Sequence, residues 1–116
     1  MRRLALLVFL LLAPIVAHAE EFVPGTEDLP LMPGLAAIDG SSLVFDKPEG
    51  RIVEAQAEGA VARKSVRQFY AATLPQLGWS AAGNNIWRRD AERLKLDYRG
   101  SDGTLTVSFT LSPAKN

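Results

Sequence analysis

The strongest pattern in the chain is a series of apolar residues at three- and four-residue spacing between Val61 and Trp79. This spacing places their side chains on one face of a helix with a 3.6-residue period. The residues are Val66, Phe69, Tyr70, Leu74 and Leu77. Pro75 constrains the last turn, and Gly78 is suited to end the helix because glycine tolerates a positive φ. The pattern predicts one long helix over about 61–77.

Alternation of apolar and polar residues predicts strands on both sides of this helix. The expected strands are 42–46 and 51–58 before the helix, then 79–81, 86–89, 93–99 and 104–111 after it. Short turn segments join them, so neighbouring strands should pair in antiparallel. One long helix on one face of a four- to six-stranded sheet is an α+β fold, a two-layer sandwich in the order ββαββ(ββ).

Residues 20–41 interrupt this pattern with prolines and glycines, and we call this segment the arm. It carries more apolar residues than an ordinary solvated linker, among them Phe22, Leu29, Leu31 and Met32. Three alternatives follow: the arm folds back along the domain, docks on a partner, or is mobile. The remaining chain is expected to form a single α+β domain over 42–112, followed by a tail at 113–116.

The start of the chain has the pattern of a cleavable secretory signal peptide. A positive pair at 2–3 precedes an apolar run over 4–16, and a small-x-small pattern at 17–19 predicts cleavage after Ala19. The run is shorter than the roughly 20 residues of a membrane-spanning helix, so an uncleaved anchor is the less favoured alternative. We therefore expect a Sec-exported protein, periplasmic or secreted, without a membrane span once residues 1–19 are removed.

The composition of the chain argues against most kinds of catalytic and metal-binding site. The sequence has no cysteine and one histidine, His18, which lies in the leader. This excludes a disulfide framework and a lipoprotein anchor, and it removes the usual ligands of zinc and haem and the usual base of a nucleophilic enzyme. No cofactor and no metal are expected. Removing Arg2 and Arg3 from 13 Lys+Arg leaves 11 against 13 Asp+Glu, a net charge of −2, which gives no reason to expect nucleic-acid binding.

Carboxylate pairs are the remaining candidates for catalysis, namely Asp90 with Glu92 and Glu54 with Glu58. General acid–base catalysis needs one desolvated carboxyl group and one that stays ionised. Both pairs are expected to face solvent, so the sequence indicates a protein that is not an enzyme. A carboxylate-dependent hydrolase is a remote alternative.

Trp79 and Trp87 flank a predicted hairpin turn. They would meet across the strands as a stacked pair and, beside Arg88 and Arg89, would offer a surface for a glycan or a peptide. In the alternative interpretation, Trp79 closes the helix end and Trp87 packs at an edge of the core. The second interpretation is the favoured one.

The helix and its exit resemble a segment of small exported bacterial proteins of unknown function. The residues that carry the resemblance are Val66, Phe69-Tyr70, Leu74-Pro75-Gln76-Leu77-Gly78-Trp79 and Trp87-Arg88-Arg89. The resemblance covers about a third of the chain and implies a helix that runs into a strand, ahead of further β-hairpins. It implies no catalytic role and no site residues.

Two functions from different classes follow. The first is a non-enzymatic interaction or accessory module of the cell envelope, which docks an envelope protein through its arm, its tryptophans or an exposed sheet edge open to strand addition. The second is a carrier of a small ligand (a lipid, peptide or glycan) held between helix and sheet or against the tryptophans. The candidate contact residues are Phe22, Leu29, Leu31, Met32, Trp79, Trp87, Arg88 and Arg89. The partner and the oligomeric state do not follow from the sequence.

Overall fold

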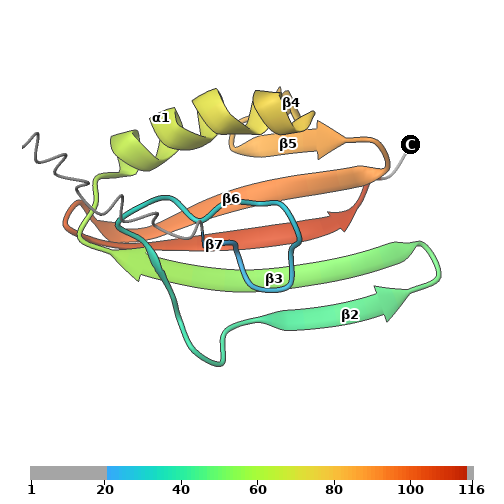
Figure 1. Cartoon of the computed structure of the whole chain (residues 1–116), viewed down its shortest axis with the longest axis horizontal. Helices are drawn as coiled ribbons and strands as arrows, with labels where there is room; N and C mark the ends of the chain where they lie inside the picture. Colours follow the sequence, from blue (N-terminus) through green and yellow to red (C-terminus); the bar gives the residue numbers. More distant parts are fainter. Residues whose placement is uncertain (1–20, 115–116) are drawn as a thin grey trace, which may run out of the picture.

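The computed structural model describes residues 21–114, so the predicted signal peptide and its cleavage after Ala19 lie outside the described residues. These residues form an α+β fold with one antiparallel sheet of seven strands and one short helix (Figure 1). The strands are β1 (Ala36–Ala37), β2 (Leu43–Lys47), β3 (Gly50–Gly59), β4 (Ser80–Gly83), β5 (Ile86–Arg89), β6 (Glu92–Ser101) and β7 (Thr104–Pro113). The helices are α1 (Arg63–Thr73) and a 3₁₀ turn, η1 (Leu74–Leu77).

The sheet has the strand order β1-β3-β7-β6-β5-β4, and β2 also pairs with β3. β1 pairs with the last residues of β3 and β2 with its first five, so β1 and β2 share one side of β3. Every pair is antiparallel, as the short turns predicted. The sequence pattern missed β1, because two alanines in a segment rich in proline and glycine give no alternation. It also placed Pro113 in a tail, whereas Pro113 ends β7.

The expectation of one long helix over 61–77 is wrong at both ends. Helix α1 begins at Arg63, whose backbone N–H donates to the Asp102 carboxylate at 2.9 Å across the loop between β6 and β7. This hydrogen bond gives the first N–H of the helix an acceptor. Ala62, the residue before the helix, has no side-chain acceptor that could cap it. The helix tightens into η1 at Pro75, which lacks an N–H. Gly78, at φ 91°, ends it as predicted.

The core is one cluster to which the helix, the sheet and the arm all contribute. Its buried members are Val23, Leu29, Leu31, Leu35, Val53, Ala55, Ala57, Val66, Tyr70, Leu74, Trp79, Leu94, Leu96, Leu105, Val107, Phe109 and Leu111. In β3, β6 and β7 these residues alternate with more exposed ones, as the sequence pattern predicted. The buried tyrosine of the helix packs edge-on against Phe109 of β7, with ring centroids 5.6 Å apart. We call the side of the sheet that faces this cluster the inner face, and the opposite side the outer face.

The arm folds back onto the domain, the first of the three alternatives. The hydroxyl of Tyr70 donates to the carbonyl oxygen of Pro30 at 3.0 Å and accepts from the backbone N–H of Met32 at 3.2 Å. Further along, the arm crosses β3 so closely that a Cβ on Gly59 would lie 2.0 Å from the carbonyl oxygen of Gly34. Only glycine fits at that position of β3, since real Cβ atoms do not approach so near.

We expect Tyr70→Phe to loosen the arm, because it leaves a buried carbonyl and a partly buried amide without their shared partner. The expected loss is about 1–2 kcal/mol of unfolding free energy in a denaturant titration, together with faster hydrogen exchange at the Met32 amide. Tyr98→Phe is the matched control, since the Tyr98 ring lies under Arg63 and Arg67 at the start of the helix. Equal exchange at Met32 in both variants would contradict this account.

Candidate functional site

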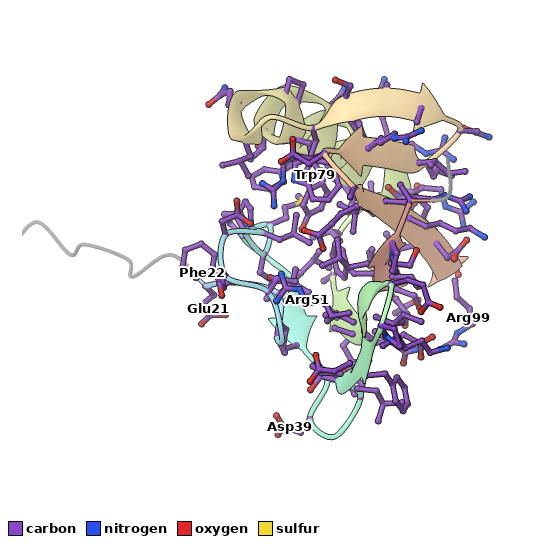
Figure 2. All side chains as sticks on the ribbon, turned by 90° about the vertical axis from the view of Figure 1, so that its right-hand side faces the viewer. Glu21, Phe22, Asp39, Arg51, Trp79 and Arg99 are labelled. Carbon is purple, nitrogen blue, oxygen red and sulfur yellow. The ribbon has the colours of Figure 1, made fainter. Side chains whose placement is uncertain are left out.

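The arm residues proposed as contacts divide into exposed and buried ones. Phe22 is exposed and lies at the periphery of the molecule (Figure 2). Leu29 and Leu31 are only 2% and 5% exposed, so they hold the arm to the core and offer no surface to a partner. Met32 is partly buried and packs against the same cluster.

The two tryptophans do not form an exposed stacked pair. Trp79 is 3% exposed and lies among the packed side chains (Figure 2), while Trp87 is half-buried against the core. The register places Ala81 opposite Trp87, so the two indoles are not direct cross-strand partners. The structure therefore agrees with the interpretation in which both tryptophans pack with the core.

Arg89 joins the arm to the end of the helix. Its guanidinium lies over the Trp79 ring, 4.4 Å from the centroid, and donates to the carbonyl oxygen of Leu77 at 3.0 Å. It also pairs with Asp28 of the arm at 2.7 Å. The hydrogen bond from Arg89 holds the pKa of the Asp28 carboxyl below its usual value, and the same bond raises the pKa of Arg89. Arg89 is thus a structural residue here.

Arg88 points to the other side of the sheet. It lines an open groove of about 850 Å³ on the outer face, together with Ile52, Ile86, Arg93 and Ser112. We call this the sheet groove. The register places Arg88 directly opposite Arg93, and Arg93 opposite Ser112, so the groove crosses three neighbouring strands and carries a basic pair on two of them. Guanidinium groups bind anions through charge-assisted hydrogen bonds, so this part of the groove suits a negatively charged group.

The most unusual surface of the described residues is on β2, which the sequence interpretation treated as an ordinary strand. Leu43, Val44 and Phe45 are 50%, 52% and 50% exposed. β2 pairs with β3 along one side, and no strand of residues 21–114 lies on its other side (Figure 1). We call this the β2 edge. The sequence contained a signal for this exposed surface, because successive side chains of a strand point to opposite faces and three consecutive apolar residues cannot all face one core.

The β2 edge and the sheet groove adjoin each other. Phe45 pairs with Ile52, and Ile52 lines the groove. Leu43 pairs with Glu54 on the same outer face, whereas Val44 pairs with the buried Val53 and lies at the rim of the inner face. The outer face therefore carries an apolar border at one side and a basic groove next to it.

The candidate catalytic carboxylates do not assemble into a site. Glu92 lies 3.8 Å from Arg51, and Asp90 lies in the turn that precedes β6. Glu54 and Glu58 are exposed on β3, on the outer face. Within residues 21–114, no group of three acidic side chains gathers closely enough to hold a metal ion, and no helix is long and apolar enough to cross a membrane.

The chain matches no family model, and comparison with curated proteins and with solved structures gives no match. The resemblance of its helix-to-strand segment to small exported proteins therefore stays a prediction. The geometry of the β2 edge and the sheet groove carries the functional argument.

The pair between Arg89 and Asp28 predicts a pH-dependent stability. Because the folded state lowers the pKa of Asp28, its contribution is fully present above the unfolded value of about 4 and is lost as the pH falls through the folded value. We expect Asp28→Asn to cost about 0.5 kcal/mol at pH 7, a modest figure because the carboxylate is half exposed. The difference from the original protein should shrink in urea titrations as the pH falls below about 4. Glu27→Gln, one residue earlier, is the control. A deficit for Asp28→Asn that stays constant with pH would contradict the assignment.

Proposed function

We propose that this protein is an exported, non-enzymatic interaction module of the cell envelope, and that a partner binds it by adding a strand to the β2 edge. The observation that carries the proposal is the half-exposed run Leu43, Val44 and Phe45 on a strand with one unpaired side. The periplasmic or secreted location rests on the signal-peptide pattern of residues 1–19.

The backbone of β2 supports strand addition. The Lys47–Gly50 pair closes a two-residue turn and is hydrogen-bonded, and hydrogen-bonded pairs alternate along an antiparallel ladder. The N–H and C=O groups of Val44 and Asp46 therefore point away from β3. Natural edge strands are usually protected by charges, proline or a bulge. Leu43, Val44 and Phe45 carry none of these, whereas Asp46 and Lys47 at the end of the strand are charged. The apolar first part of the edge therefore suits a partner that satisfies its backbone and covers its side chains.

In this proposal the chain is a two-layer sandwich, with α1 and the arm as one layer and the sheet as the other. The arm and helix cover the inner face, where Gly25 of the arm lies beside Val44, and they leave the outer face and the outward backbone groups of β2 for recognition. The absence of histidine and cysteine after His18 supports a role without catalysis.

Site-specific photo-crosslinking in intact cells tests the β2 edge. p-Benzoylphenylalanine at Phe45 should give a defined adduct, because that side chain is exposed beside the unpaired side of the strand. The same probe at Gln68, exposed on α1, is the control and should give none. Val44→Pro should abolish the Phe45 adduct, since proline removes the N–H that points to the partner but none that points to β3. Absence of a specific adduct at Phe45 would overturn the proposal.

The sheet groove supports a second candidate function, the binding of a small anionic amphiphile. Arg88 and Arg93 would hold its charged group, and Ile52 and Ile86 would contact its apolar part. This site differs from the one expected from the sequence, because side chains of the core fill the space between helix and sheet and Trp79 is buried.

Calorimetric titration with dodecyl phosphate tests the sheet groove, with uncharged dodecyl maltoside as the reference ligand. We expect Arg93→Gln to weaken binding of the phosphate about tenfold, the effect of one charge-assisted hydrogen bond. Arg99→Gln is the matched control, since Arg99 lies on the same strand and is exposed but does not line the groove. Equal affinity for both ligands, or equal loss in both variants, would exclude an anion site here.

A further inference from the structure

The sequence of β2 is complementary to itself. Consider two copies that pair in antiparallel along the β2 edge, with a two-fold axis at Val44. Leu43 of one copy then lies opposite Phe45 of the other, and Ser42 lies opposite Asp46. Directly opposite residues of an antiparallel pair share a face, so two leucines and two phenylalanines would form one apolar cluster on the outer face. The two Val44 side chains would meet on the inner face.

Neighbouring registers lack this match. An axis at Phe45 pairs Phe45 with itself but places Leu43 opposite Lys47 and Val44 opposite Asp46, so two of the three apolar side chains would face a charge. An axis at Leu43 places Val44 opposite Ser42 and Phe45 opposite Ser41. Of these three registers, only the axis at Val44 places all three apolar side chains opposite apolar side chains, and it leaves no like charges opposite each other.

The backbone agrees with this register. In the β2–β3 ladder, Lys47 and Gly50 form a hydrogen-bonded pair, and such pairs alternate along the strand. The backbone N–H and C=O groups of Phe45 and Leu43 therefore bond to β3, and those of Val44 point outward. A two-fold axis at Val44 therefore pairs the outward groups of one copy with the outward groups of the other. The pairing satisfies N–H and C=O groups that the isolated chain leaves to solvent.

We propose that the occupant of the β2 edge is a second copy of this chain, which forms a symmetric dimer with one continuous antiparallel sheet. The inference rests on the proposed function, because it uses the same edge and names the partner. A closed two-fold pairing uses the β2 edge of each copy, so this interface cannot bind a third copy. A five-residue strand buries less than a standard interface of about 800 Å² per partner, so we expect a dissociation constant on the order of 10 μM.

Cysteine crosslinking tests the register, and the absence of cysteine from the natural sequence makes each introduced thiol unambiguous. Non-hydrogen-bonded pairs bring Cα atoms to about 4.5 Å, within disulfide range. A mixture of Leu43→Cys and Phe45→Cys proteins should therefore form a mixed disulfide at least tenfold faster than either protein alone. Ser80→Cys on β4, at the other edge of the sheet, is the control and should crosslink only at the background rate.

Sedimentation over 1–300 μM measures the dimer itself. The original protein should pass from monomer to dimer, and Val44→Lys, which sets two charges at the axis, should stay monomeric. Circular dichroism and denaturant titration should show that this variant folds as the original does, since Val44 is half exposed. A monomer throughout this range, with no preferred mixed disulfide, would overturn self-pairing. The photo-crosslink at Phe45 to a different protein would then still support the β2 edge as a docking site, and its absence would overturn both.

Discussion

The hydroxyl group of Tyr70 is the contact on which the organisation of this chain depends. One oxygen atom, buried between helix and sheet, bonds to two backbone groups of the arm, the carbonyl of Pro30 and the amide of Met32. Burial raises the pKa of this hydroxyl, so it keeps its proton and its donor role at any ordinary pH. The proline-rich arm has little regular structure of its own, and this bond fixes it where its leucines complete the core.

Arg89 completes the attachment of the arm from the other side. It stacks on Trp79 and bonds to both Leu77 and Asp28, and so it links the helix exit, the arm at Asp28 and β5. With Tyr70 it shields the inner face of the sheet. The proposed recognition surfaces, the outer face and the β2 edge, lie away from both of these contacts.

The sequence predicted the elements that local periodicity determines. The alternation in β6 and β7 and the stop at Gly78 were readable from spacing alone. The start of α1 was not, because Asp102 supplies its cap from the distant β6–β7 loop. The candidate site was mostly missed for a similar reason. Whether Leu31 is a contact or a core residue depends on where the arm lies, and the exposure of Phe45 depends on which strand forms the edge.

The pairing of β3 with β7 has a consequence for the order of folding. Val53 lies opposite Leu111, so the central ladder joins a strand near the start of the domain to the last strand of the chain. Such distant pairings form slowly, since the loop between them must close before any contact is gained. A chain that is synthesised from its N-terminus therefore lacks the β3–β7 ladder until β7 is available. Folding to the native state is therefore postponed until β7 has been synthesised.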